Sequence, residues 1–166
     1  ILSDGKPIRL LRNPSLGPPN SSHNMGYSYP VLVDWDNDGR RDLLCPNETN
    51  RIFWFKNVGT RKQPRFTARK QILCDGYPDT PETIAESARL AGDKSTPNQP
   101  YPYEKNRPFF WRTGAAIADF NGDGLADLVT HDGYTRKATL FVQYRHDDGT
   151  LHLRKERPLK LADGRL

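Results

Sequence analysis

Short segments of apolar or alternating residues recur along the chain, and turn-forming residues separate them. Each segment is three to nine residues long, which is typical of β-strands rather than of helices. The 13 glycines and 14 prolines also favour short elements joined by turns. We therefore expect an all-β fold. The predicted strands are 31–33, 43–45, 51–57, 65–73, 115–118, 128–130, 139–145 and 151–159.

These strands fall into two sets because the sequence repeats itself. The stretch VLVDWDNDGRRDLL at 31–44 aligns with AAIADFNGDGLADLV at 115–129, and both contain the pattern D-x-[DN]-x-D-G-x-x-D. A second repeated element reads ILSDGKP at 1–7, ILCDGYP at 72–78 and LADGRL at 161–166. Such a repeat decides the architecture, since each copy is one structural unit.

We divide the chain into two repeats. Repeat 1 covers 1–71 and contains an acidic loop at 34–42. Repeat 2 covers 72–166, contains a long insertion at 74–112 and an acidic loop at 119–127, and ends at the start of a third repeat. Four successive strands joined by short turns predict a four-stranded antiparallel sheet of the kind that forms a β-propeller blade.

Two blades make a partial propeller with open edges, and open edges need partners. We expect these partners to be further blades, either in the same longer chain or in other chains that assemble with it. The first residue is Ile1 rather than Met, which also suggests a processed chain or a piece of a longer one.

The two acidic loops predict two metal sites. Acidic or amide side chains at relative positions 1, 3, 5 and 9, with glycine at position 6 for a sharp turn, suit a hard cation with six or more oxygen ligands. Calcium fits this set, and the smaller magnesium ranks second. The expected ligands are Asp34, Asp36, Asp38, Asp42 and the carbonyl of Arg40 in one loop, and Asp119, Asn121, Asp123, Asp127 and the carbonyl of Leu125 in the other.

An EF-hand loop begins in the same way but requires a glutamate at position 12 and helices on both sides. Position 12 is Cys45 in one copy and Thr130 in the other, and both flanks are short and apolar. The alternative, that these are acidic turns that bind nothing, is weakened by the presence of two copies in the same strand context. Because unneutralised carboxylates repel each other, metal binding should be coupled to folding.

The loops and their surroundings resemble the FG-GAP/VCBS repeat of integrin-α-type β-propellers. The stretch RIFWFKNVGTRKQPRF at 51–66 is similar to the third and fourth strands of that repeat, with its Asn-x-Gly-Thr turn. The resemblance implies structural calcium in the loop between the first two strands of each blade, six to eight blades in a complete ring, and an extracellular or cell-surface setting. It also implies ligand binding on the face opposite the calcium loops.

The loops that precede the first strand of each blade supply the candidate binding residues on that face. Tyrosine and tryptophan stack on sugar rings, and arginine pairs with carboxylates or sulfates. The candidate ligand-binding residues are Tyr29, Tyr101, Tyr103, Arg107 and Trp111. Weaker candidates for catalysis are His23, Tyr27 and Arg112. A structural or solvated role fits His23 and Arg112 as well, and Trp111 fits packing between blades together with Phe109 and Phe110.

Net charge points to an anionic partner. The chain carries a net charge of +5, yet seven of its 20 acidic residues lie in the two loops, so the rest of the molecule is strongly basic. A basic body suits an acidic polysaccharide or another anionic partner. No nucleic-acid-binding motif is present, and no apolar run is long enough to span a membrane.

Three functions remain compatible with these features. The first is a calcium-stabilised extracellular module that binds carbohydrate or protein. The second is a part of a polysaccharide lyase, because propellers similar to this one occur among lyases of acidic polysaccharides; Arg112 would neutralise the uronate and His23 or Tyr27 would take the proton. The third is a structural or assembly subunit. The only cysteines, Cys45 and Cys74, are compatible with a disulfide or with two buried thiols.

Overall fold

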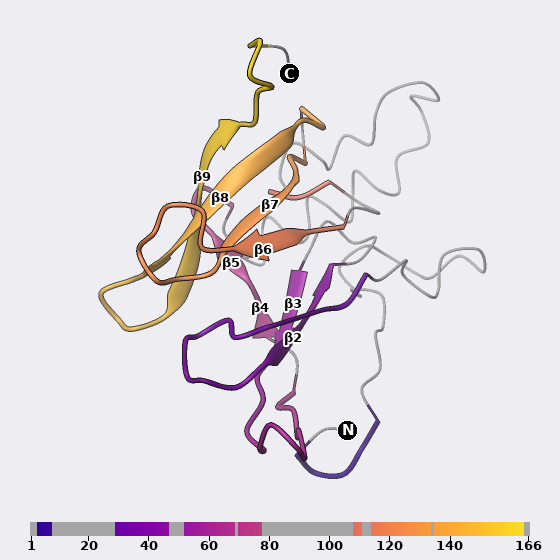
Figure 1. Ribbon diagram of the computed structural model, residues 1–166. Helices are drawn as coiled ribbons and strands as arrows, with labels where there is room; N and C mark the ends of the chain where they lie inside the picture. Colours follow the sequence, from indigo (N-terminus) through magenta and orange to yellow (C-terminus); the bar gives the residue numbers. More distant parts are fainter. Residues whose placement is uncertain are drawn as a thin grey trace, which may run out of the picture.

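The computed structural model describes residues 3–7, 29–46, 52–68, 70–77, 108–110, 114–133 and 135–164. These residues form an all-β structure with two sheets, as the sequence predicts, and they contain no helix. Neither sheet closes on itself within these ranges. The two sheets lie next to each other, with the first in purple to magenta and the four antiparallel strands of the second in orange to yellow (Figure 1).

The first sheet contains four strands in sequence order, and every pairing is antiparallel. Leu44 in the second strand pairs with Val31 on one side and Trp54 on the other. Side chains on a strand alternate between its two faces, so this register sets which of them enter the core. The strands are β1 (Val31–Val33), β2 (Asp42–Pro46), β3 (Ile52–Phe55) and β4 (Lys70–Gln71).

The second sheet repeats this arrangement and adds a fifth strand. Its antiparallel strands are β6 (Ala116–Ala118), β7 (Asp127–His131), β8 (Ala138–Arg145) and β9 (Leu151–Pro158). The pair Leu128–Phe141 here occupies the place of Leu43–Phe55 in the first sheet. This shared register gives a residue-by-residue correspondence between the two halves.

The segment 65–73 differs from the expected single strand. Two residues of it form β4 at the edge of the first sheet, and the chain then continues as β5 (Leu73–Cys74), which pairs in parallel with β9 of the second sheet. Ile72 between them is buried, and its N–H donates to the carbonyl of Ile52 at 2.9 Å. This short segment therefore makes backbone hydrogen bonds with strands of both sheets and links the two sheets covalently.

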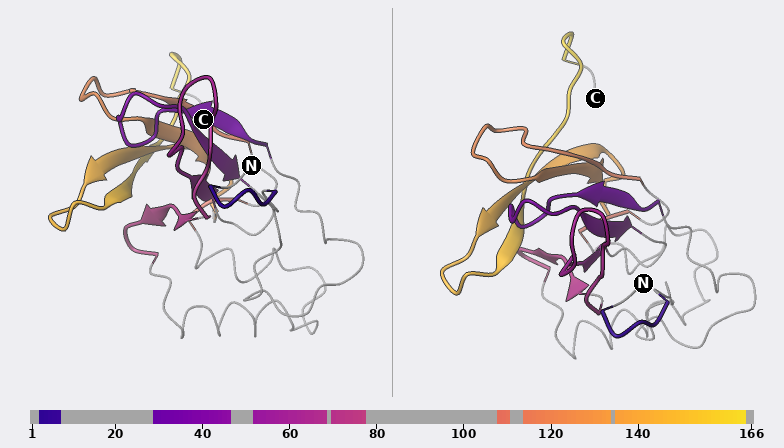
Figure 2. Two further views of the ribbon diagram at one scale, coloured as in Figure 1. Left: turned by 90° about the horizontal axis from the view of Figure 1, so that it is seen from below. Right: turned by 60° about the horizontal axis from the view of Figure 1, so that its bottom comes forward.

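A single apolar cluster spans the two sheets. It includes Trp35 and Leu44 from the first half and Leu128, Phe141 and Leu153 from the second, all almost fully buried. Burial of such side chains contributes about 1.5–3 kcal/mol each, so the contact between the sheets is a major source of stability. The two views of Figure 2 show the sheets adjoining in the same way from other directions.

Cys45 and Cys74 do not form a disulfide, which settles the alternatives left open by the sequence. Both are buried, but in different apolar clusters. Within the described ranges, no helix is long and apolar enough to cross a bilayer.

Candidate metal loops and a polar cluster

The two acidic loops connect β1 to β2 and β6 to β7, and they project on the same side of the molecule in every view (Figures 1 and 2). Their backbones follow the same path. Asn37 and Gly122 have φ of 59° and 81°, and Gly39 and Gly124 have φ of 85° and 86°. This left-handed conformation is the reason for glycine at position 6 of each loop.

The first aspartate of each loop is held by the loop's own backbone. Asp34 accepts hydrogen bonds from the N–H of Asp38 at 2.9 Å and of Gly39 at 2.8 Å. Asp119 accepts hydrogen bonds from the N–H of Asp123 at 3.1 Å and of Gly124 at 2.9 Å. These hydrogen bonds lower the pKa of Asp119, and the one from Gly124 has the largest effect. The framework of each loop is therefore preformed around a carboxylate.

The last aspartate of each loop joins it to the segment just after β3 in the first sheet and to β8 in the second. Asp42 accepts from the N–H of Trp35 at 3.3 Å and of Asn57 at 2.7 Å. Asp127 accepts in the same way from Phe120 at 3.0 Å and Gln143 at 2.9 Å. Both carboxylates are fully buried. These hydrogen bonds show a bracing role for the two residues, in addition to the ligand role expected from the sequence.

Asp42 also accepts a hydrogen bond from the indole Nε1 of Trp54 at 2.9 Å. Burial nevertheless raises the pKa of Asp42, although the hydrogen bonds from Asn57, Trp54 and Trp35 act to lower it. A buried carboxylate with three N–H donors is a costly group to disturb, so substitution here should affect folding before it affects any ligand.

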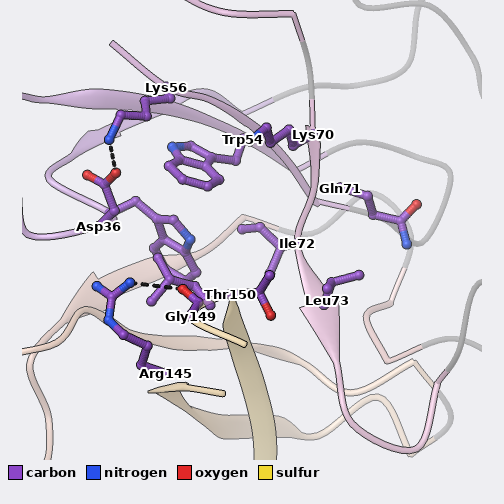
Figure 3. Close-up of a pocket in the computed structure, with 12 residues that line it drawn as sticks. Asp36, Trp54, Lys56, Lys70, Gln71, Ile72, Leu73, Arg145, Gly149 and Thr150 are labelled. Carbon is purple, nitrogen blue, oxygen red and sulfur yellow. Dashed lines mark hydrogen bonds and ion pairs between the residues drawn. The ribbon is translucent and has the colours of Figure 1, made fainter. Parts of the chain in front are cut away.

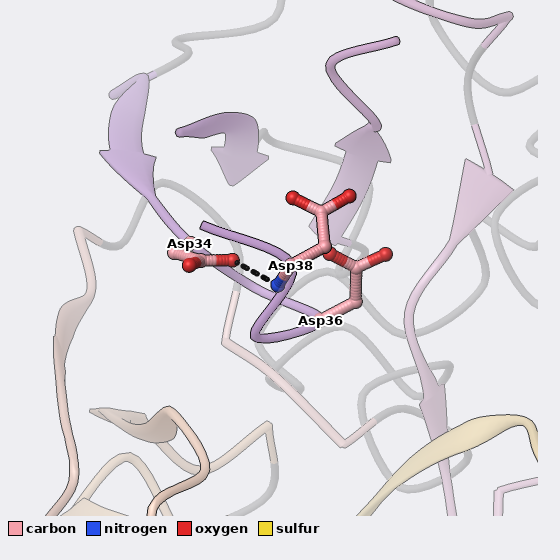
Figure 4. Close-up of side chains that lie close together, drawn as sticks. All are labelled: Asp34, Asp36 and Asp38. Atoms are coloured by element: carbon pink, nitrogen blue, oxygen red, sulfur yellow. Dashed lines mark hydrogen bonds between the residues drawn. The ribbon is translucent and has the colours of Figure 1, made fainter. Parts of the chain in front are cut away.

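Three carboxylates gather in the first loop. Ligand oxygens of Asp34, Asp36 and Asp38 all lie within 4.8 Å of one another, which is the spacing that one metal ion needs. In Figure 4 the carboxylates of Asp36 and Asp38 lie side by side, and Asp34 is held by the N–H of Asp38. Among the described residues, this is the group of acidic side chains that fits a cation best.

Two basic side chains neutralise part of this charge. The ammonium of Lys56 contacts Asp36 and lies 2.8 Å from Asp38 Oδ2, and the guanidinium of Arg40 lies 2.5 Å from the same oxygen. Burial opposes the charged form of Lys56, but its hydrogen bonds to Asp36 and Asp38 raise its pKa. Burial likewise opposes ionisation of Asp38, and the hydrogen bond from Lys56 holds its pKa below the ordinary value.

One carboxylate oxygen in this loop has no donor. Asp36 Oδ1 is buried and accepts no hydrogen bond. A buried carboxylate oxygen without a partner is unfavourable unless a cation contacts it. The donor set is all oxygen, and one of its members lacks a partner, so the residues fit a calcium ion.

The second loop differs from the first in charge. Asn121 stands where the first loop has Asp36, and its amide donates to Asp123 Oδ2 at 2.8 Å. The positions of Arg40 and Lys56 are taken by Leu125 and Val142, so this loop contains no basic side chain. It therefore has fewer carboxylates but also no competing ammonium group.

The expected ligand and catalytic residues are mostly outside the described part of the chain. His23, Tyr27, Tyr101, Tyr103, Arg107, Trp111 and Arg112 all lie there. Tyr29 is described, is 51% exposed, and donates its backbone N–H to the carbonyl of Pro46 at 3.3 Å. Its role in ligand binding stays a prediction.

A polar cluster that the sequence analysis missed lies where β5 meets β9. Asp75 accepts from the hydroxyl of Tyr144 at 2.7 Å and contacts His152 Nδ1 at 3.1 Å, while His152 Nε2 lies 3.0 Å from Thr150 Oγ1. This order resembles a nucleophile–base–acid arrangement. The Thr150 hydroxyl, however, donates to Asp148 at 2.5 Å, so it is not directed at a substrate.

The cluster instead holds the end of β5 against β8 and β9 within the second sheet. Burial opposes ionisation of Asp75, but hydrogen bonds from Tyr144 and His152 lower its pKa. The available sequence signal was the repeated Asp-Gly turn, ILCDGYP, whose aspartate is Asp75. Only the fold brings His152 to it, 77 residues later.

No protein-family model matches the chain, and searches of curated proteins and of solved structures found no match.

Proposed function

We propose that this chain is part of a calcium-stabilised β-propeller of the FG-GAP/VCBS type and acts as an extracellular module that binds carbohydrate or protein. The observation that supports the proposal most is the shared framework of the two acidic loops. In each loop the same positions are left-handed, and N–H groups at the same positions donate to the first aspartate. The last aspartate of each loop accepts a hydrogen bond from an N–H group at the same place in its sheet. One turn of this kind is weak evidence, whereas two at equivalent places in two sheets indicate a common purpose.

Calcium would be held in the first loop by Asp34, Asp36 and Asp38, whose oxygens gather, with Asp42 and the carbonyl of Arg40. In the second loop it would be held by Asp119, Asn121, Asp123, Asp127 and the carbonyl of Leu125. When bound, it neutralises these oxygens and ties the ends of the first two strands of each blade. The ion is structural in this proposal, because the loops lie at the corner of each sheet. Calcium ranks before magnesium because each loop offers many oxygen donors, and calcium takes more protein oxygen ligands than magnesium does.

A calcium titration tests this proposal. Isothermal titration calorimetry of the whole chain should detect two sites, and calcium should raise the melting temperature while a chelator reverses the change. At a calcium concentration of about 100 times Kd, the free energy of unfolding should rise by about 2.7 kcal/mol for each site. Magnesium at the same concentration should have a smaller effect.

Matched variants separate the two loops. Asp34→Asn and Asp119→Asn should each remove one site, and the double variant should lose the response altogether. Asp148→Asn, in the exposed β8–β9 turn, is the control and should keep both sites. A melting temperature that calcium does not change would exclude the proposal.

The lyase alternative depends on His23, Tyr27 and Arg112, which lie outside the described residues. No described group favours it, so we do not propose it. The assembly alternative is tested together with the binding role: a chain that binds calcium but no saccharide or protein would have a structural function.

A further inference from the structure

A cavity of about 350 Å³ lies where the end of the first sheet meets the β8–β9 hairpin of the second. Its volume falls in the range typical of small-ligand sites. Both halves of the chain are needed to form it. The residues that matter here are Trp35, Trp54, Lys56, Lys70, Gln71 and Arg145, and Figure 3 shows how those from the two sheets face each other.

The cavity combines an aromatic surface with positive charge. Trp54 is half-buried, and Lys70 Nζ lies 5.7 Å from the centre of its indole. Lys56, Lys70 and Arg145 supply three basic side chains, whereas Asp36 is the one acidic side chain in the lining. Lys70 and Arg145 make no ion pair with a described carboxylate, so their charge is available to a ligand.

The polar groups suit a ring that carries hydroxyl groups and an acid. Arg145 uses Nη1 to donate to the carbonyl of Gly149 at 3.1 Å, which orients the guanidinium and leaves its other N–H groups for an anion. Gln71 and Thr150 also line the space. An indole face next to guanidinium and ammonium groups favours a sugar ring bearing a carboxylate or a sulfate.

Lys56 connects this cavity to the first acidic loop. It lines the cavity, and its ammonium also contacts Asp36 and Asp38, two of the carboxylates that fit a metal ion. A calcium ion on those carboxylates would compete with the ammonium for the same oxygens. Release of Lys56 from Asp36 then adds an unpaired positive charge to the cavity.

We infer that this cavity is a binding site for an acidic saccharide, and that calcium in the first loop strengthens binding by releasing Lys56 toward the ligand. The site itself is independent of the proposed metal role, whereas its calcium dependence rests on it. Because linkage is reciprocal, the saccharide should also tighten calcium binding by the same factor.

Titration of the whole chain with short oligosaccharides tests the site, with tryptophan fluorescence and calorimetry as readouts. The probes are an oligogalacturonate, a sulfated oligosaccharide of the same length and a neutral one. At least one acidic probe should bind, and the neutral probe should bind about tenfold more weakly or not at all. Binding to oligogalacturonate alone assigns a carboxylate ligand, and binding to the sulfated probe alone assigns a sulfate. Equal affinity for the neutral probe would overturn the inference.

Substitutions distinguish a specific site from general attraction to a basic protein. Arg145→Gln and Lys70→Gln should each weaken acidic-probe binding by about tenfold. Arg157→Gln is the matched control, because Arg157 is exposed on β9 and does not line the cavity. If Arg157→Gln weakened binding as much as Arg145→Gln, the attraction would be diffuse and the inference wrong.

The calcium step has its own test. Acidic-probe affinity should be several-fold higher in calcium than in chelator, and Lys56→Met should abolish this difference. Calcium binding without any acidic-probe binding overturns the cavity site but leaves the proposed function standing. Acidic-probe binding in a protein that does not bind calcium overturns the proposed function and the Lys56 step, while the cavity site stands.

Discussion

The side-chain amide of Gln143 donates a hydrogen bond to the backbone carbonyl of Trp35 at 3.1 Å, although the two residues are 108 positions apart. Gln143 lies near the end of β8, and Trp35 lies between two of the candidate metal ligands. Both residues are buried. The first acidic loop is therefore anchored to the second sheet, and the position of the loop depends on contact between the two halves.

This anchor predicts the effect of Gln143→Glu. The substitution replaces the amide donor with a carboxylate that faces a carbonyl in a buried place, so we expect a loss of at least about 2 kcal/mol in the free energy of unfolding. Urea unfolding followed by tryptophan fluorescence measures it. Gln63→Glu, in an exposed turn, should change stability by less than about 0.5 kcal/mol. If both substitutions lowered the free energy of unfolding equally, the Gln143–Trp35 hydrogen bond would contribute nothing to stability.

A second prediction concerns the turn after β3. Asn57 accepts from the N–H of Gly59 at 2.9 Å and of Arg65 at 3.2 Å, which pulls the turn closed. A Cβ on Gly59 would lie 2.4 Å from the carbonyl oxygen of Gln63, a backbone atom that cannot move away easily. Gly59→Ala should therefore destabilise the chain by about 1–3 kcal/mol.

Gly114→Ala provides the control for that measurement. A Cβ at Gly114 meets nothing within 4 Å, and its backbone is not left-handed. Thermal unfolding of the two variants should show a clear drop in melting temperature for Gly59→Ala alone. An unchanged melting temperature for Gly59→Ala would contradict the close approach of the backbone in this turn.

A third prediction concerns the ion pair between Asp132 and Lys155, which links the end of β7 to β9. Asp132 is fully buried, and Lys155 is 32% exposed at its side chain. Lys155→Met should cost about 2–3 kcal/mol, below the value for a fully buried pair because Lys155 is partly solvated. Arg154→Met removes an exposed ion pair with Glu156 on the same strand and should cost less than about 1 kcal/mol.

The same pair has a defined pH dependence. Burial opposes ionisation of Asp132, but its hydrogen bond from Lys155 lowers its pKa below the ordinary 3.8. Burial also opposes the charge of Lys155, and Asp132 raises its pKa above the ordinary 10.5. The stabilisation is therefore present between these ordinary values, and is lost as pH falls through the lowered pKa of Asp132 or rises through the raised pKa of Lys155.

Chemical denaturation of wild type and Lys155→Met at a series of pH values tests this dependence of stability on pH. The difference in stability should be constant from about pH 5 to pH 9 and should shrink below about pH 4. A difference that grows in acid would contradict the assignment of Asp132 as an ionised partner.

A fourth prediction concerns the two thiols. Burial raises the pKa of Cys74 to about 12, so its reactive thiolate is scarce at neutral pH. Neither cysteine is disulfide-bonded, and both are buried. A thiol reagent at pH 8 should react slowly with the native chain and rapidly with two thiols after denaturation. Absence of reaction in denaturant would instead indicate a disulfide.

The eight predicted strand segments each contain a strand in the structure, because short alternating runs between turn residues have few other ways to bury their apolar side chains. The glycine of each acidic loop is likewise local information, since its left-handed backbone follows from the residue type. Both features depend on neighbours in the sequence.

Relationships between distant residues were settled only by the tertiary structure. The chain passes from β4 in one sheet to β5 in the other because the edges of the two sheets meet there, and no local sequence pattern predicts this. The contact of Lys56 with Asp36, 20 residues away, and the assembly of Asp75 with His152 also require the folded chain. Local sequence therefore predicted where the strands lie, apart from the division of 65–73 between two sheets, and it predicted the acidic, glycine-containing loops. The packing of the two halves decided which charges meet, because a strand register specifies pairs within one sheet and says nothing of its neighbour.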